Sequence, residues 1–478
     1  MAEHSFAWLI TARARAAPDA VVVVADDQVL TAADLDRQSN RLARSYRELG
    51  VRRDDLVSVA LPNSAEFVIV CAAIWKTGAT PMPTSPTLDD SERGKIEELA
   101  RPVLSVGVRP VHPQIRWVET GFDPDPGLSD AELPDSWASC WKAPTSSGST
   151  GVPAVIRAAA PALLDPERPV AAFLPSEAVQ LVSGPIWHSA SFTYAFRGLL
   201  TGHRLIILPG FDERRVLASI ARHRVSWTLL SPTMIHRLLR VPEPERLAAD
   251  VSSLETVLHL GSPCPPADKR GLIDWLGPHR VVEVYAGGES NGLTMIRGDE
   301  WLERPGSVGR PIGGTELRVV RGDGSVADAG EVGEVWMRRG PRPTYSYLGR
   351  PSRRTTDGWD SLGDAGFLDA QGNLTIIDRV ADRIVSAGVH IYPAEVERVL
   401  EEHPLVRGAI AFGVPDEQLG CVVEAVVDVA GVAVEADSLR AFAARRLDEL
   451  RVPRRIRLQD KPVRSDAGKV RRPRNLAG

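Results

Sequence analysis

The sequence predicts a large α/β domain followed by a small α+β domain, and three observations support this. The chain has 478 residues, which is more than one small hydrophobic core requires. Strand-like and helix-like runs alternate through its first 300 residues, which is typical of helix-covered parallel sheets. A charge-dense segment, residues 378–383, separates two apolar stretches and marks a boundary. We therefore expect an N-terminal domain at residues 1–379 and a C-terminal domain at residues 380–478.

The first part of the chain supplies clear element boundaries. Residues 21–25 form a β-branched run that predicts a strand. Thr31 is a suitable N-cap, and apolar residues at helical spacing follow it as far as Gly50. We expect a second strand at residues 57–61 and a second helix at residues 66–76, which Gly78 ends.

The same alternation continues after residue 200 and then changes. We expect strands at residues 204–208, 227–230, 255–260 and 281–285, and helices at residues 212–222 and 233–239. From about residue 313, short strands and glycine turns (residues 316–320 and 331–338) predict a small β subdomain. In the C-terminal domain we expect a helix from Pro393, strands at residues 408–412 and 422–428, and a helix at residues 438–450.

Composition excludes several classes of protein. The net charge of −5 gives no basic excess for nucleic acid or an anionic membrane. The four cysteines and ten histidines lack metal-ligand spacing. The longest apolar run, residues 67–75, is too short to span a bilayer, and the amino terminus has no signal-peptide pattern. We expect a cytoplasmic protein that acts on small molecules; its oligomeric state stays open.

The segment 145–153 reads Thr-Ser-Ser-Gly-Ser-Thr-Gly-Val-Pro and has the composition of a surface loop. Its glycines leave backbone N–H groups accessible and its hydroxyls add hydrogen-bond donors, which suits a polyphosphate. No Gly-Lys-Ser/Thr follows, so the loop is not a Walker motif. A flexible linker is the alternative.

Three further stretches carry side chains suited to a nucleotide. Tyr285 ends a strand before Gly287 and Gly288, so its ring could stack on a base, and the carboxylate of Glu289 could bind Mg²⁺. Asp364 follows a glycine and could accept two ribose hydroxyls, with Arg379 donating from the other side. The alternatives are an ordinary turn with a solvated glutamate and a surface ion pair.

The basic tail contains Lys469, which a glycine precedes. A turn at that glycine could project the ammonium into a cleft. The alternative is a basic tail that solvates itself.

In their order and spacing these motifs resemble the adenylate-forming superfamily, which comprises acyl- and aryl-CoA synthetases, peptide-synthetase adenylation domains and luciferases. The likeness extends from the helix near Thr31 to the basic tail. It is strongest to bacterial fatty-acid and bile-acid CoA ligases, through Gly306-Ser-Val-Gly-Arg-Pro311 and Ile391-Tyr-Pro-Ala-Glu-Val-Glu397. The resemblance implies ATP and Mg²⁺ as cofactors and a mobile C-terminal domain.

The resemblance also implies a role for each matching position. Lys469, Glu289 and His188 are the implied catalytic residues, and Glu289 is also the implied Mg²⁺ ligand. Asp382 matches the hinge of the mobile domain. The implied ATP and AMP contacts are Thr145, Ser146, Ser147, Gly148, Ser149, Thr150, Gly151, Gly261, Ser262, Pro263, Tyr285, Ala286, Gly287, Gly288, Asp364 and Arg379. The implied substrate pocket contains Trp187, His188, Ser191 and Phe192. Taken alone, His188 is also compatible with a buried core histidine.

Three positions depart from the family pattern. Ala154 stands where the family usually has a lysine, and Arg157 is a candidate replacement for that charge. Gly288 replaces a threonine near the α-phosphate. Ala387 replaces the first glycine of the Gly-Gly pair at the thiol tunnel, so its methyl group could narrow the pantetheine path.

These patterns leave three functions in competition. The first is an ATP-dependent ligase that adenylates a hydrophobic or aromatic carboxylic acid and transfers it to CoA. The second adenylates its substrate but uses an amine acceptor, or activates nitrite to diazotise an aryl amine. The third is a non-catalytic nucleotide-binding protein, which would have no use for a hinge and a mobile lysine.

Overall fold

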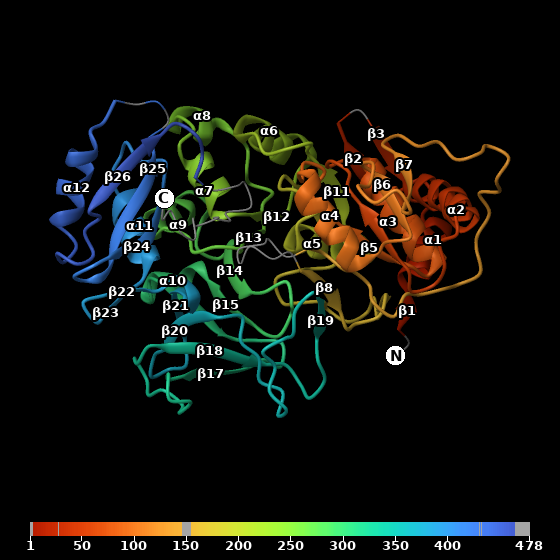
Figure 1. Cartoon of the computed structure of the whole chain (residues 1–478). Helices are drawn as coiled ribbons and strands as arrows, with labels where there is room; N and C mark the ends of the chain where they lie inside the picture. Colours follow the sequence, from red (N-terminus) through yellow and green to blue (C-terminus); the bar gives the residue numbers. More distant parts are fainter. Residues whose placement is uncertain (1–2, 27, 146–153, 430, 432, 464–478) are drawn as a thin grey trace.

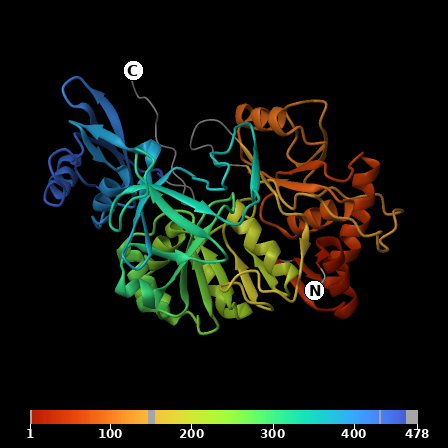
Figure 2. The ribbon, with the colours of Figure 1, turned by 90° about the horizontal axis from the view of Figure 1, so that it is seen from below.

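The computed structural model describes residues 3–26, 28–145, 154–429, 431 and 433–463 (Figure 1). In both views the N-terminal elements lie at one end of the molecule and the C-terminal elements at the other (Figures 1 and 2). The middle of the chain lies between them and carries the central sheet. The described part of the chain contains no helix long and apolar enough to cross a membrane.

A sheet of thirteen strands forms the centre of the molecule. Its strands are parallel from β14 to β2, with β3 added antiparallel at that edge. In spatial order the strands are β17 (Glu316–Val320), β18 (Gly333–Arg338), β20 (Asp364–Leu368), β21 (Leu374–Arg379), β16 (Ser307–Pro311), β15 (Leu293–Arg297), β14 (Val281–Ala286), β13 (Thr256–His259), β12 (Trp227–Leu230), β10 (Val179–Val182), β11 (Arg204–Ile207), β2 (Val21–Ala25) and β3 (Gln28–Thr31).

A second, parallel sheet of four strands belongs to the N-terminal region. Its order is β5 (Thr80–Pro83), β4 (Leu56–Val59), β6 (Leu104–Gly107) and β7 (Arg116–Glu119). Its neighbouring helices are α1 (Phe6–Ala16), α2 (Ala32–Glu48), α3 (Ala65–Thr77) and α4 (Asp90–Ala100). Twelve of the thirteen residues of α3 are buried, because this helix packs inside the N-terminal core rather than on its surface.

The remaining helices of the N-terminal region follow the central strands along the chain. They are α5 (Ser189–Leu200), α6 (Glu213–His223), α7 (Pro232–Leu239), α8 (Glu243–Ala248), α9 (Pro266–Leu276) and α10 (Gly298–Glu303). Two short ribbons complete the region: β1 (His4–Ser5) with β9 (Leu163–Leu164), and β8 (Val155–Ala158) with β19 (Tyr345–Leu348).

The glycine-rich β region predicted after residue 313 is antiparallel and joins the central sheet. Strand β21 pairs with β16, which links β20, β18 and β17 to the parallel strands. The small β subdomain is therefore continuous in hydrogen bonding with the sheet beside it.

The C-terminal segment has a hydrophobic core of its own, drawn from residues between Ile384 and Ile456. Its elements are the short 3₁₀ turn η1 (Val380–Asp382), β22 (Ile384–Ser386), β23 (Val389–Ile391), α11 (Pro393–Glu401), β24 (Gly408–Asp416), β25 (Gly420–Asp428), α12 (Ala436–Ala444) and β26 (Arg455–Gln459). Helix α12 ends at Ala444, six residues before the predicted end, and turns follow it. The predicted fold class is confirmed, whereas the boundary between residues 379 and 380 stays a prediction.

Candidate active site

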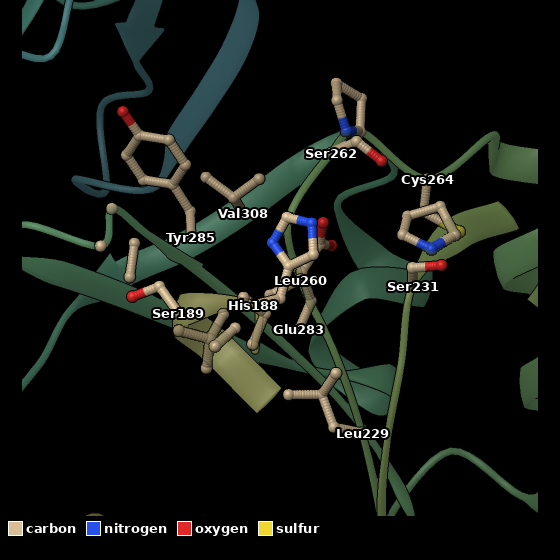
Figure 3. Close-up of a pocket in the computed structure, with 18 of the residues that line it drawn as sticks. His188, Ser189, Leu229, Ser231, Leu260, Ser262, Cys264, Glu283, Tyr285 and Val308 are labelled. Carbon is tan, nitrogen blue, oxygen red and sulfur yellow. The ribbon is translucent and has the colours of Figure 1, made fainter. Parts of the chain in front are cut away.

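A cavity of about 2390 Å³ lies at the carboxyl ends of the central parallel strands. Strand β12 leads into Ser231, β13 into residues 261–263, and β14 into the glycine turn after Ala286. Figure 3 shows Tyr285, Ser231 and Ser262 around this pocket. Ligands of open α/β sheets bind at this edge, because the loops that follow the strands meet there. Side chains of α11 line the same cavity from the C-terminal segment.

Three of the predicted nucleotide residues form one connected group. Asp364 and Arg379 are directly opposite each other in β20 and β21, and Arg379 Nε lies 2.7 Å from Asp364 Oδ1. The Tyr285 hydroxyl donates to Asp364 Oδ2 at 2.5 Å. Burial and the neighbouring Asp364 carboxylate raise the pKa of Tyr285, so its hydroxyl stays a donor at neutral pH. A carboxylate has about four acceptor positions, so Asp364 retains acceptors for ribose hydroxyls.

Glu289 lies just beyond β14 and is 8% exposed. Its Oε1 accepts a hydrogen bond from the Tyr347 hydroxyl at 2.6 Å, and its backbone carbonyl accepts one from Thr344 Oγ1 at 3.0 Å. Tyr347 is opposite Ile156 in the β8–β19 ribbon. Its hydrogen bond therefore fixes Glu289 beside strand β8. Sequence reasoning missed Tyr347. Tyr345 and Tyr347 are two residues apart on a strand and so lie on the same face, and this pair of tyrosines on one face was an available indication.

The residues that could hold Mg²⁺ fit that ion only with a phosphate ligand. No group of three or more His, Cys, Asp or Glu side chains suited to a metal is present in the described ranges. Mg²⁺ is commonly bound by one or two carboxylates together with substrate phosphates. Glu289 supplies one such carboxylate.

Packing after β14 excludes a side chain at Gly287 and leaves little room for one at Gly288. A Cβ atom on Gly287 would overlap the Leu362 side chain, and one on Gly288 would lie 3.1 Å from Ser189 Oγ. Gly261 has a φ of +105°, which an alanine rarely adopts. These residues, together with Ala286, Ser262 and Pro263, line the cavity.

Most of the predicted phosphate loop, Ser146, Ser147, Gly148, Ser149, Thr150 and Gly151, lies outside the described residues, as does Lys469. Their roles stay predictions. Thr145 is described, lines the cavity and forms an isolated bridge with Val155. Ala154 is fully buried.

Arg157 does not replace the cation that is absent at residue 154. Ile156 and Ala158 line the cavity, and Arg157 lies between them on β8, so strand alternation turns it to the other face. The expectation that Arg157 compensates is wrong for this reason.

His188 and Ser191 line the cavity as expected, but two of their predicted neighbours do not. His188 precedes α5 and its ring is stacked on Trp187, with a centroid distance of 4.7 Å; Figure 3 shows it beside Tyr285 and Glu283 in the pocket. Trp187 instead packs against the N-terminal core. Phe192 is fully buried among aromatic rings, 4.6 Å from Phe196, because it lies on the core face of α5. The assignment of Phe192 and Trp187 to the pocket lining is corrected accordingly.

Sequence reasoning also missed Lys142, which lines the cavity and is 3% exposed. Its Nζ donates to Thr193 Oγ1 at 2.6 Å and to Ser189 Oγ at 3.1 Å. Burial, and then the charge of Arg197, lowers the pKa of Lys142 to about 7, while Glu289 acts in the opposite direction. A lysine in an apolar stretch directly before the glycine-serine segment was the available indication.

The predicted hinge residue Asp382 lies in η1 and lines the cavity. Beyond it, Ala387 and Gly388 form the two-residue turn between β22 and β23, with φ angles of +47° and +79°. Two positive φ angles are typical of a tight hairpin turn, and a glycine adopts them without strain. Ala387 is exposed and lies outside the cavity lining.

Comparison with known proteins gives matches along almost the whole chain. The family model described as AMP-binding enzyme matches residues 10–348, and the AMP-binding enzyme C-terminal domain matches residues 395–469. The chain is 31% identical to feruloyl-CoA synthase from an Amycolatopsis species, with 96% of both chains covered. It is 28% identical to 2-succinylbenzoate–CoA ligase from Bacillus subtilis, with 97% of this chain and 96% of the relative covered.

Solved structures agree with these matches. The o-succinylbenzoate CoA synthetase of Bacillus subtilis in complex with its acyl-adenylate intermediate has a TM-score of 0.83, with 25% identity and 99% of this chain and 98% of that chain covered. The amide bond synthetase McbA from Marinactinospora thermotolerans has a TM-score of 0.80, with 24% identity and 97% of both chains covered. The latter likeness is one of fold.

Proposed function

The chain belongs to the family of AMP-binding enzymes and is an AMP-forming ligase, and we propose that it activates a hydrophobic or aromatic carboxylic acid and transfers the acyl group to CoA. Cofactors in this proposal are ATP and Mg²⁺, and CoA is the co-substrate. Two relatives named for aromatic acids, feruloyl-CoA synthase and 2-succinylbenzoate–CoA ligase, support the substrate class.

The connected group of Tyr285, Asp364 and Arg379 is the observation that carries the proposal. It joins the edge of the parallel sheet to the β20–β21 ribbon by two charge-assisted contacts. With Tyr285 beside an adenine ring and Asp364 accepting the ribose hydroxyls, a nucleotide would have its phosphates near Glu289. Tyr285, Asp364 and Glu289 thus follow the order of adenine, ribose and phosphates in ATP.

The chemistry explains why an acid needs this site. A carboxylate is a poor electrophile because it would have to expel an oxide. Attack of a carboxylate oxygen on the α-phosphorus forms a C–O–P anhydride, and the bond from that phosphorus to the bridging oxygen breaks as pyrophosphate leaves. Mg²⁺ held by Glu289 and the phosphates would supply positive charge near the phosphoryl oxygens. Lys469, in the proposed role, would stabilise the charge that develops on those oxygens.

A second candidate acceptor, an amine, is favoured by one observation. Ala387 puts a methyl group where the family has the first glycine of its thiol tunnel, and this residue already has a left-handed backbone. A narrowed tunnel would disfavour CoA and leave adenylation unchanged. Activation of nitrite to diazotise an aryl amine belongs to the same CoA-independent group.

An acceptor panel separates these functions. The enzyme is incubated with ATP, Mg²⁺ and a set of aromatic and fatty acids, with CoA, an amine or no acceptor; nitrite replaces the acid in a further series. AMP release and the product mass are measured. We expect AMP release that depends on the acid and a thioester that forms only with CoA. An amide or diazonium product that forms without CoA would replace the first function with the second.

A further inference from the structure

Three lysines in the described part of the chain are almost fully buried, and one of them differs from the others. Lys76 is 2% exposed and Lys269 is 1% exposed. Lys76 Nζ lies 2.7 Å from Asp36 Oδ1, and Lys269 pairs with Glu283. Lys142, by contrast, bonds to two neutral hydroxyls. A buried cation without a carboxylate partner is costly in free energy, so its retention needs a reason.

The hydroxyls around Lys142 are oriented differently from each other. Thr193 accepts from Lys142 and donates its own proton to the backbone carbonyl of Ser189 at 2.6 Å. Ser189 also accepts from Lys142, but its own hydroxyl proton has no acceptor among the described residues. Ser189 can therefore donate that proton to a ligand in the cavity.

Helix α5 presents a polar face to this part of the cavity. Ser189, Thr193 and Arg197 lie on successive turns, four residues apart, and all three line the cavity with Lys142. The ring of Trp141 contacts both cations: its centroid lies 5.0 Å from Lys142 Nζ and 4.7 Å from Arg197 Cζ. The walls here combine positive charge with aromatic surface.

This polar face lies next to the glycine turn that precedes Glu289. A Cβ atom on Gly288 would lie 3.1 Å from Ser189 Oγ, and Gly288 directly precedes Glu289. The Ser189 hydroxyl therefore lies between Lys142 and the glycine turn. The side chain at residue 154 carries no charge, so Lys142 supplies a cation that the family pattern did not predict here.

We propose that Lys142 and the Ser189 hydroxyl bind an anionic oxygen of the acid substrate, with Thr193 positioning the ammonium. The inference rests on the proposed function, because it assumes that the cavity receives an acid beside ATP. The anionic oxygen belongs either to the carboxylate that reacts or to a second carboxylate on the same molecule. In both cases the chemistry is that of a carboxylate meeting one ammonium and one hydroxyl.

Binding of simple acids tests the proposal without requiring turnover. Benzoate and phthalate are titrated by calorimetry into the wild type and into the Lys142→Met, Lys142→Arg and Lys76→Met variants. We expect Lys142→Met to raise the Kd of at least one acid about 10- to 100-fold, because a hydrogen bond to a charged group is lost. Lys142→Arg keeps the positive charge but changes its shape, so it should weaken binding less than Lys142→Met at pH 7. ATP binding should not change.

Lys76→Met is the matched control. It removes an equally buried lysine, and its partner Asp36 is outside the cavity lining. We expect a lower melting temperature and an unchanged Kd for both acids.

The two acids also separate the two possible carboxylates. A Kd that rises in Lys142→Met for benzoate and phthalate alike would assign the subsite to the reacting carboxylate. A Kd that rises for phthalate alone would assign it to a second carboxylate.

Acid binding should also depend on pH in the wild type. Lys142 is cationic below its pKa of about 7, so the Kd should rise tenfold per pH unit above that value, and the slope should vanish in Lys142→Met. Arg197, Glu289 and Cys140 are the ionisable groups that act on Lys142; Lys142→Arg should extend tight binding to higher pH.

Several results would overturn the proposal. These are a Kd in Lys142→Met within twofold of wild type for both acids, a flat wild-type pH profile, or no binding of either acid to the wild type. Absence of pyrophosphate release with every acid would instead contradict the proposed function. Acid binding is measured without turnover, so the Kd values would still test the role of Lys142 in that case.

Discussion

The two ends of the cavity are held together by different kinds of contact. At the nucleotide end, Asp364 is paired with Arg379 and bonded to Tyr285, so charges of opposite sign already meet within the protein. At the acid end, the hydrogen bonds of Lys142 Nζ within the described residues go to the neutral hydroxyls of Ser189 and Thr193. At the nucleotide end the charged groups are paired without a ligand. The acid end has an excess of positive charge.

This difference indicates how the two substrates are recognised. A nucleotide brings hydroxyls and a ring that add to contacts already formed, so its site is preorganised. An acid brings the negative charge that the second site lacks, so its binding should depend on the charge of Lys142. Changes at the two ends should therefore affect different kinetic constants.

The largest effect should come from Lys469→Ala, which removes the cation proposed to act between the two ends. We expect kcat for AMP formation to fall about 10²- to 10³-fold, because one donor to the developing phosphoryl charge is lost. KM for ATP and KM for the acid should both stay near wild type. Steady-state pyrophosphate release measures all three constants.

Lys461→Ala is the control for that change, since Lys461 is an exposed lysine eight residues earlier. It should leave kcat unchanged. If Lys469→Ala kept kcat within a few-fold of wild type, the assigned role of Lys469 would be wrong.

An intermediate effect should follow from Asp364→Asn, which removes the charge that organises the nucleotide end. We expect KM for ATP to rise about 10- to 100-fold, because Arg379 loses its ion pair and the ribose loses a charged acceptor. The Kd for benzoate should not change. Asp323→Asn, in an exposed turn outside the cavity lining, is the matched control.

An equal loss of ATP and acid affinity in Asp364→Asn would show that the two ends are not separable. Calorimetric titration of each ligand into the same preparation makes this comparison directly.

The smallest effect should come from Ala387→Gly, which touches neither end. A left-handed alanine costs roughly 1–2 kcal/mol, part of which the lower backbone entropy of alanine in the unfolded chain offsets. We expect the glycine variant to unfold a few degrees higher in calorimetry and to raise the rate with CoA relative to an amine. Ala381→Gly, in η1, should not raise the unfolding temperature. A destabilised Ala387→Gly would contradict the backbone argument.

The sequence was most informative for residues at strand ends and turns, whose positions depend on their immediate neighbours in the chain. The strand that ends near Tyr285 was predicted to within one residue, and Asp364 and Arg379 were expected on two sides of one ligand; they face each other in β20 and β21. Turn residues and strand ends fix such positions locally.

What could not be predicted depends on how elements pack. Phe192 and Thr193 are adjacent in α5, yet one lies in an aromatic core and the other lines the cavity. Only the rotation of the helix against its neighbours decides this. Lys142 and Ser189 are 47 residues apart, and Tyr347 and Glu289 are 58 apart, so their contacts required the fold.

Acid-dependent exchange of labelled pyrophosphate into ATP tests most directly whether an acid anion meets ATP in this cavity. We predict exchange with at least one aromatic or fatty acid in the wild type, and a raised acid KM with unchanged KM for ATP in Lys142→Met. No exchange with any carboxylate or with nitrite would contradict adenylate formation by this chain.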